Sequence, residues 1–205
     1  MKLASQNRRQ SGAALMPLII FAAFAALLVY AIVKMNSGEY VPREVPTPLI
    51  GKPAPAFDLP LLLQQGNITE LDLKSEVTLV NVWASWCFAC RQEHEVVKFL
   101  ARQGIRVIGL NYKDENQDAI SWLNKLGNPY QKIAVDLEGR SAIDWGVYGA
   151  PETFLVDERG IIRHKVIGPL TSLKVVDPLL HVARERGYTE LVASLEIVRN
   201  RFVGE

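Results

Sequence analysis

A pair of cysteines at a strand-to-helix junction constrains this chain more than any other feature. Cys87 and Cys90 are its only two cysteines, and they follow an apolar run over 77–82 that is typical of a buried strand. A helix that begins at the first cysteine brings positions i and i+3 onto one face, so the two sulfurs can close a small, reversible disulfide. The pattern predicts a redox-active dithiol on an α/β scaffold.

The two cysteines have different expected roles. The amide N–H groups and the dipole at a helix start stabilise a thiolate, and in such motifs the pKa of the first thiol falls to roughly 3.5–7.5 from about 8.5. We therefore expect Cys87 to be the nucleophile. Cys90 lies one turn deeper in the helix and is expected to resolve the mixed disulfide that Cys87 forms with a partner.

The N-terminal part of the chain has the composition of a membrane segment. Residues 15–33 carry no charged side chain, a length that suffices to cross a bilayer as a helix. Lys2, Arg8 and Arg9 precede this run, so the positive-inside rule places residues 1–14 in the cytoplasm and the remainder in the periplasm. We predict an uncleaved, single-pass anchor at 15–34 in a bacterial inner membrane. The alternative is a cleaved secretory signal, whose apolar region is usually shorter.

The charge of the remaining chain excludes one function class. Four of the 23 basic residues and none of the 22 acidic residues lie in 1–34, which leaves the rest acidic overall. We therefore expect no nucleic-acid partner. Two cysteines are also too few for a scaffold held by disulfides. A proline-containing stretch over 35–53 predicts an extended linker between anchor and domain.

Hydrophobic periodicity and turn residues predict one α/β domain over 54–187, followed by a C-terminal helical extension over 188–205. Its expected architecture is a central mixed β-sheet flanked by helices, with an N-terminal β-hairpin. The expected strands are 56–59, 68–71, 77–82, 107–111, 132–135, 153–157 and 161–167. The expected helices are 87–103, 117–126, 173–186 and 189–201, with Thr171 as the cap of the third and Pro178 as a point where that helix kinks or restarts.

Several motifs carry a resemblance to a known family. Trp86-Cys-x-x-Cys after a strand, with Pro151 before a hairpin, resembles the thioredoxin fold. The resemblance narrows to the CcmG/DsbE family, the thiol:disulfide interchange proteins of cytochrome c maturation, and covers about 50–186 and the anchor. Its motifs are the segments 81–87, 91–94, 104–107, 109–114, 126–130 and 146–154.

The resemblance implies a thiol-disulfide oxidoreductase that acts as a reductant. Its implied substrates are the haem-attachment cysteines of apocytochrome c, or a partner thiol protein of the maturation system. A membrane electron donor of the DsbD/CcdA type would reduce the Cys87–Cys90 pair again. We expect no cofactor and no metal ion.

The resemblance also implies roles around the dithiol. Pro151 is expected to follow a cis peptide bond and to leave the backbone of Ala150 free to pair with an extended substrate; the alternative is a trans proline that starts a strand. Glu152 and Glu93 are expected to form an acidic surround that raises the pKa of Cys87 and favours a reductant. For Glu93, a solvated helix face is an equal alternative.

Aromatic residues are candidates for the substrate-binding rim. We expect Trp86 to shape the mouth of the dithiol and Tyr148 to line a partner groove, although Tyr148 reads equally well as an ordinary half-buried aromatic. Phe88 is expected to contact the partner. The pair Phe88-Ala89 departs from the Pro-Thr of many family members, which leaves the reduction potential open.

Two residues in and just after the strand before the dithiol have separate expectations. Trp83 is predicted to lie in the core. Asn81 occupies the strand position where thioredoxin itself has a buried carboxylate, and asparagine cannot titrate as a base. Proton transfer would then fall to Glu152, Glu93 or water.

Other functions fit parts of the same pattern. Cys87, Cys90 and His94 lie near one helix face and could bind copper, as in a metallochaperone. The cysteines could also form a static structural disulfide, although so short a loop stabilises little. Within the enzyme class, the alternative is a general periplasmic thioredoxin-like reductase.

Overall fold

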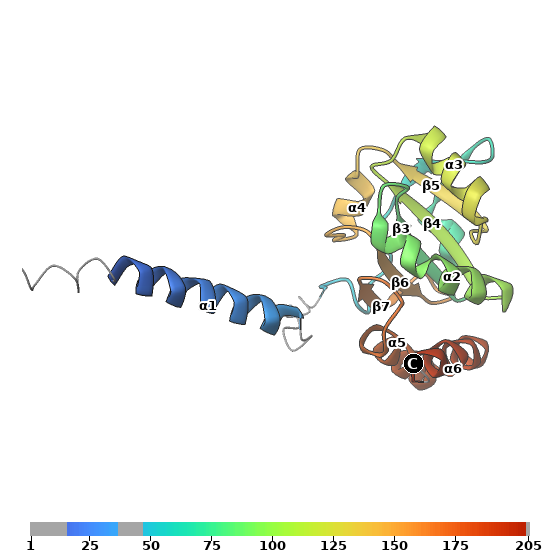
Figure 1. Ribbon diagram of the computed structural model, residues 1–205. Helices are drawn as coiled ribbons and strands as arrows, with labels where there is room; N and C mark the ends of the chain where they lie inside the picture. The colour runs from blue at the N-terminus through green and yellow to red at the C-terminus, as the bar shows by residue number, and fades with distance from the viewer. Residues whose placement is uncertain (1–15, 37–46, 204–205) are drawn as a thin grey trace, which may run out of the picture. The chain divides into compact units, whose positions relative to one another are not determined.

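The computed structural model describes residues 16–36 and 47–203, which fall into two units. The boundary lies between Val45 and Pro46, and each unit is described by itself. The predicted cytoplasmic segment 1–14 and much of the predicted linker lie outside the described residues. Figure 1 shows the helix of the first unit and the α/β domain of the second.

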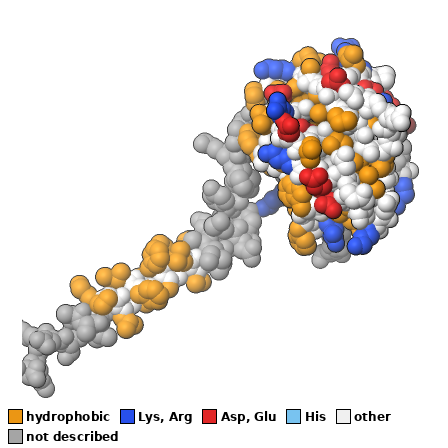
Figure 2. Space-filling model, turned by 90° about the horizontal axis from the view of Figure 1, so that it is seen from above, with side chains coloured by type: hydrophobic (Ala, Val, Ile, Leu, Met, Phe, Trp, Pro, Cys, Tyr) orange, Lys and Arg blue, Asp and Glu red, His pale blue; other side chains and the backbone are white. Residues whose placement is uncertain are grey.

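The first unit contains one helix, α1 (Met16–Asn36), of 21 residues. Hydrophobic side chains cover the part of it that Figure 2 colours, and those of Met16, Phe21 and Tyr30 are mostly exposed. Over the ranges that the structure describes, however, no helix combines the length and the apolarity needed to cross a membrane. The predicted anchor at 15–34 therefore finds no support in the described helices.

A five-stranded mixed sheet forms the centre of the second unit, as predicted. Its order is β5-β4-β3-β6-β7, with β3 parallel to β4, β4 parallel to β5, and β6 antiparallel to both β3 and β7. All six residues of the central strand β3 are buried, which explains its unbroken apolar sequence. The strand bounds are β3 (Thr78–Trp83), β4 (Arg106–Tyr112), β5 (Lys132–Asp136), β6 (Glu152–Val156) and β7 (Ile162–Ile167).

Alternate side chains of β3 build two different cores. Leu79 and Trp83 belong to a cluster with apolar residues of α2, α3, α5 and α6, whereas Val80 and Val82 pack with the N-terminal hairpin and Trp145. Because side chains alternate along a strand, each core lies on its own face of the sheet. The helices are α2 (Phe88–Arg102), α3 (Asn116–Leu126), α4 (Arg140–Asp144), α5 (Leu173–Arg186) and α6 (Thr189–Val203).

The predicted N-terminal hairpin is present as β1 (Asp58–Pro60) paired with β2 (Asn67–Thr69). The residues after β2 form a 3-10 turn, η1 (Glu70–Leu73), where the sequence predicted more strand. The reason is local: the Asp72 carboxylate accepts a hydrogen bond from the Thr69 backbone N–H at 2.9 Å and caps the turn.

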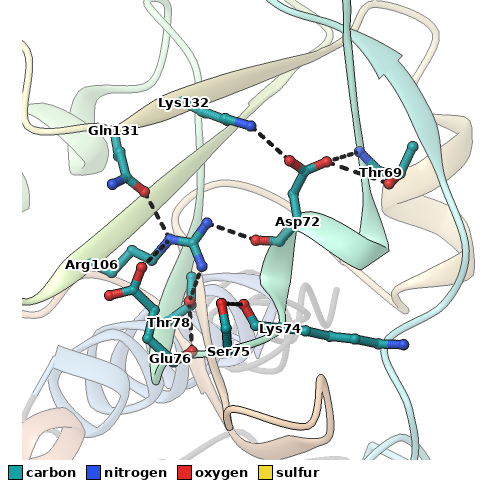
Figure 3. Close-up of polar contacts among 9 residues, drawn as sticks. All are labelled: Thr69, Asp72, Lys74, Ser75, Glu76, Thr78, Arg106, Gln131 and Lys132. Atoms are coloured by element: carbon teal, nitrogen blue, oxygen red, sulfur yellow. Dashed lines mark hydrogen bonds and ion pairs between the residues drawn. The ribbon is translucent and has the colours of Figure 1, made fainter.

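A polar network holds this hairpin on the sheet (Figure 3). Lys132 Nζ donates to Asp72 Oδ1 at 2.6 Å, and Arg106 Nη2 donates to the Asp72 carbonyl at 2.7 Å. Arg106 Nε also donates to Gln131 Oε1 at 2.8 Å. Side chains of β4 and β5 thus bind η1 directly, in addition to the apolar packing of the hairpin on the sheet.

The C-terminal helices pack as a pair, side by side in Figure 1. α5 begins after Ser172 rather than Thr171 and continues through Pro178 as one helix, so the predicted restart is wrong, and the predicted kink stays a prediction. In α6, Leu195 and Val198 are buried in the same core cluster as α2. The predicted C-terminal extension is therefore a helix that covers this core.

Candidate active site

The two cysteines occupy the first turn of α2, directly after the loop that leaves β3. Cys87 is the N-cap residue of α2, and its sulfur accepts a hydrogen bond from the Cys90 backbone N–H at 3.0 Å. The cysteines form a disulfide with a Cα–Cα distance of 5.3 Å. Both are buried, Cys90 at 2 % exposure and Cys87 at 5 %. The predicted pairing across one helical turn is confirmed.

A carboxylate from the loop after β4 holds the segment of chain that leads to Cys87. Asp114, in the loop after β4, accepts hydrogen bonds from the Ser85 backbone N–H and from the Ser85 hydroxyl, both at 2.6 Å. Asn111 Nδ2 also donates to Asp114, at 2.9 Å. The indole N–H of Trp86 donates to the carbonyl of Lys113 at 2.9 Å. Lys113 and Asp114, in the loop after β4, therefore hold both residues that precede Cys87, a role that the sequence did not predict.

Three aromatic residues predicted for the rim are exposed. The exposed fractions are 58 % for Trp86, 75 % for Phe88 and 63 % for Tyr148. Trp86 and Phe88 flank Cys87 in the chain, so two large apolar side chains stand in the open next to a buried sulfur. The interpretation of Tyr148 as a half-buried aromatic is wrong, and the partner-binding role of all three stays a prediction.

The Ala150–Pro151 peptide bond is cis, as predicted. Pro151 is buried, and half-buried Ala150 packs against the core cluster that contains both cysteines. The pairing of β6 with β3 begins only at Glu152, so Ala150 lies just before the strand. The pairing of Ala150 with a substrate backbone stays a prediction.

Glu93 lies in the interior, on the face of α2 that covers the sheet. Its side chain is 1 % exposed, so the alternative of a solvated helix face is wrong. Oε1 accepts a hydrogen bond from Asn81 Nδ2 at 2.8 Å, and Oε2 accepts one from the Leu170 backbone N–H at 2.9 Å. Asn81 in turn accepts from the Tyr130 hydroxyl at 2.9 Å.

This network places a titratable group inside the protein. Burial raises the pKa of Glu93 to about 7, against the lowering effect of its two hydrogen bonds. Burial likewise raises the pKa of Tyr130 well above its ordinary value, with the Glu93 charge as a second cause. The position in β3 where thioredoxin has a buried carboxylate is occupied here by Asn81. The Glu93 carboxylate, which comes from α2, accepts a hydrogen bond from that amide. The interior next to the dithiol helix thus contains an acid that titrates near neutral pH.

Glu152 has a different environment from the one predicted. It is 1 % exposed, and its Oε2 lies 2.9 Å from Lys165 Nζ, whose side chain is 3 % exposed. Its Oε1 accepts a hydrogen bond from the Tyr148 backbone N–H at 2.9 Å. The carboxylate is thus neutralised by a buried lysine, which weakens its expected part in an acidic surround.

The copper-binding alternative finds no support in the structure. His94 Nε2 lies 2.9 Å from the Gly127 carbonyl oxygen, and the imidazole packs edge-on against Trp122 at 4.3 Å between ring centroids. Among residues 16–36 and 47–203, no group of three or more His, Cys, Asp and Glu side chains is arranged to hold a metal ion. His94 serves the packing between α2 and α3.

The fold and the dithiol together define a class: thiol-disulfide oxidoreductases with a thioredoxin-like fold. Residues 49–180 match the Redoxin family. The chain is 48 % identical to the thiol:disulfide interchange protein DsbE of Allochromatium vinosum over 179 residues, which are 85 % of this chain and 94 % of that protein. It is also 48 % identical to DsbE of Escherichia coli K12 over 158 residues, 76 % of this chain and 85 % of that one. The chain therefore belongs to the DsbE family of thiol:disulfide interchange proteins.

Solved structures agree with this assignment. A crystal structure from Chlorobium tepidum, described as a DsbE protein, superposes with a TM-score of 0.53 at 26 % identity and covers 71 % of this chain and 97 % of its own. A thioredoxin-like solution structure from Neisseria meningitidis gives a TM-score of 0.54 at 23 % identity, covers 64 % of this chain and 89 % of its own, and supports the fold alone. The predicted thioredoxin-like fold is confirmed.

The order of attack by the two cysteines is open to direct trapping. We expect Cys90→Ala to accumulate a covalent mixed disulfide between Cys87 and a disulfide-containing peptide, because no second thiol remains to release it. Cys87→Ala, the matched control, should form no adduct through Cys90, which lies deeper in α2. Mass spectrometry after acid quenching measures both. An adduct of equal yield on Cys90 would contradict the assigned roles.

Proposed function

We propose that this protein reduces disulfides between haem-attachment cysteines of apocytochrome c, or the disulfide of a partner thiol protein in the same pathway. Membership of the DsbE family supports thiol-disulfide exchange. The motif resemblance in 81–87 and 146–154 supports the cytochrome substrate. The alternative within the class is a general periplasmic reductase.

The proposed reaction is a two-electron exchange. The Cys87 thiolate attacks one sulfur of the substrate disulfide and forms a mixed disulfide, and the other substrate sulfur leaves as a thiolate. Cys90, once deprotonated, attacks the Cys87 sulfur and releases the second substrate thiolate. The substrate ends as a dithiol and the enzyme as the Cys87–Cys90 disulfide seen here. A membrane electron donor of the DsbD/CcdA type is proposed to return two electrons to it.

The observation that carries the direction of electron flow is the buried carboxylate of Glu93. It lies one helical turn after Cys90, and with a pKa of about 7 it is largely ionised above neutral pH. A negative charge in the interior opposes a thiolate on Cys87. The reduced form of this protein then lacks the thiolate stabilisation that makes a strong oxidant. Glu93 therefore favours a reductant. Glu152 contributes less because Lys165 neutralises it.

The reduction potential tests this proposal. We expect the full-length protein, equilibrated with glutathione and dithiothreitol buffers, to have a potential toward that of thioredoxin, near roughly −270 mV. Glu93→Gln should raise the potential by on the order of 30 mV, a factor of about ten in the equilibrium constant. Glu95→Gln, an exposed glutamate of the same helix, is the control and should leave it unchanged. A wild-type value near about −120 mV would make the protein an oxidant and contradict the proposal.

Substrate choice needs its own comparison. The rate of reduction of a disulfide-bonded Cys-x-x-Cys-His peptide is measured beside that of a peptide with the same cysteines in scrambled sequence. Faster reduction of the haem-attachment peptide supports the cytochrome substrate, and equal rates support the general reductase.

The location is part of the proposal. We place the domain in the periplasm and the N-terminal segment in the inner membrane, on the uncharged run over 15–33 and the basic residues before it. This inference rests on the sequence, since the described helices do not support a span. Cell fractionation followed by protease treatment of spheroplasts measures it, and a protected domain would contradict the periplasmic side.

A further inference from the structure

A buried lysine connects the strand after the cis proline to the loop before it. Lys165 is in β7, and only 3 % of its side chain is exposed. Its Nζ donates to the Gly146 carbonyl at 2.6 Å and lies 2.9 Å from Glu152 Oε2. The same atom lies 4.4 Å from the centroid of the Tyr148 ring. One cation therefore contacts the beginning, the middle and the end of the segment 146–152.

These contacts explain how a short segment keeps one conformation. The Tyr148 backbone N–H donates to the other oxygen of Glu152 at 2.9 Å, so that the carboxylate joins the loop to the strand. Register pairs Lys165 with Phe154 across the β6–β7 ladder, and the lysine cation lies 5.4 Å from the Phe154 ring. Removing a charge from water is costly unless it is paired and hydrogen-bonded, and Lys165 is both. Such a group fixes its partners more tightly than a solvated lysine would.

The loop that Lys165 holds packs on the core cluster of the dithiol at Ala150 and is open to solvent at Tyr148. Ala150 packs against the core cluster that includes Cys87 and Cys90. Tyr148, although its ring binds the cation, is 63 % exposed. A cation under an aromatic ring orients that ring while its outer face stays accessible. The ring and the backbone beside it are thus presented to a polypeptide that approaches the sulfurs.

We propose that Lys165 is a positioning residue that sets the segment 146–151 for binding a polypeptide disulfide. This inference deepens the proposed function and rests on it for the identity of that polypeptide. Lys165 touches neither sulfur; it acts through Gly146, Tyr148 and Glu152. Its loss should therefore weaken recognition of a polypeptide more than exchange with a small disulfide, because only the polypeptide uses the loop.

The test compares two disulfide substrates in the full-length protein. One is the disulfide-bonded Cys-x-x-Cys-His peptide and the other is oxidised glutathione. We expect Lys165→Met to lower the ratio of the peptide rate constant to the glutathione rate constant by about tenfold, as misplacement of a binding segment does. Hydrogen exchange at the amides of 146–150 should become faster in the same variant. Lys165→Arg, which keeps a cation able to bind carbonyl, carboxylate and ring, should restore most of the ratio.

Two further variants separate positioning from general effects. Lys132→Met removes another strand lysine that forms an ion pair, with Asp72 at 2.6 Å (Figure 3), and should not change the ratio. The double variant Lys165→Met with Glu152→Gln leaves no unpaired buried charge, so it decides the question even where the single variant fails to fold. Its ratio should stay low, since the contacts with Gly146 and Tyr148 are still lost.

Three outcomes would overturn the inference. They are an unchanged ratio in Lys165→Met, an equal fall of both rate constants, and a double variant whose ratio returns to that of wild type. The last would show that Lys165 only neutralises Glu152. Failure of the proposed function is a separate result: wild-type protein would then reduce the haem-attachment peptide no faster than the scrambled one, while the hydrogen-exchange result for the loop would still stand.

Discussion

The contribution of Glu93 to the stability of this protein is expected to decrease between pH 4.5 and about pH 8, because Glu93 loses its proton inside the core. Its pKa of about 7 against an ordinary 4.5 corresponds to about 3 kcal/mol. Between these two values the folded protein binds a proton that the unfolded chain has released, so the free energy of unfolding falls as pH rises. Relative to Glu93→Gln, which cannot titrate, wild type should lose about 3 kcal/mol over this range.

The comparison uses the change in the free energy of unfolding with pH, not the absolute stability of the variant. Both carboxylate oxygens accept hydrogen bonds, from Asn81 and from the Leu170 backbone, and a glutamine replaces one acceptor by an NH₂ group. This cost is the same at every pH and cancels in the slope. Urea unfolding at several pH values measures it. Glu95→Gln, on the exposed face of the same helix, is the matched control and should follow wild type; a Glu93→Gln curve parallel to wild type would show that Glu93 does not titrate in this range.

The location of Glu93 bears on proton transfer in the proposed reaction. Cys90 must lose a proton before it can attack the mixed disulfide. A carboxyl group with a pKa of about 7 is half protonated near neutral pH, which is the condition for exchanging protons in either direction. Asn81 cannot do this, but it holds the Glu93 carboxylate at 2.8 Å and so fixes its position. The assignment of this proton transfer to Glu93 stays a prediction.

The sequence predicted the elements whose cause is local. The apolar run before Cys87 specified β3, and the cysteines with Gly104 at the other end bounded α2 within one residue at each end. The short helix α4 was missed because its start depends on a side chain from a strand: Asp136 at the end of β5 accepts a hydrogen bond from the Ala142 backbone N–H at 2.7 Å. No periodicity in five residues reveals such a cap.

The site was predictable only where a motif carries it. Cys87, Cys90 and the cis bond before Pro151 follow from short, recognisable segments. The environment of Glu93 could not be predicted in this way, because the burial of one helix face depends on which other elements pack against it. Its contact with Leu170 joins residues far apart in the chain. Lys165 was missed for the same reason: alone in a strand, it reads as a surface lysine.

A second large effect is expected from Asp114→Ala. The substitution leaves the Ser85 backbone N–H, the Ser85 hydroxyl and the Asn111 amide without their acceptor. Hydrogen bonds to a charged group contribute more than neutral ones, and unsatisfied buried donors are costly. We therefore expect the free energy of unfolding to fall by about 3 kcal/mol, measured by urea unfolding of the oxidised protein.

The same variant should also slow thiol-disulfide exchange. Ser85 and Trp86 directly precede Cys87, and the loop that contains Asp114 binds both, so its release shifts the nucleophile relative to the partner. A displacement of about 1 Å at a reacting group costs up to about a hundredfold in rate.

Asp114→Asn keeps one carbonyl acceptor and should lie between Asp114→Ala and wild type in both measurements. Asp118→Ala, which removes an exposed carboxylate from the first turn of α3, is the control for charge alone and should change neither the exchange rate nor the stability by a comparable amount. Loss of stability with an unchanged exchange rate in Asp114→Ala would mean that the hydrogen bonds between Ser85 and Asp114 support the fold without positioning Cys87.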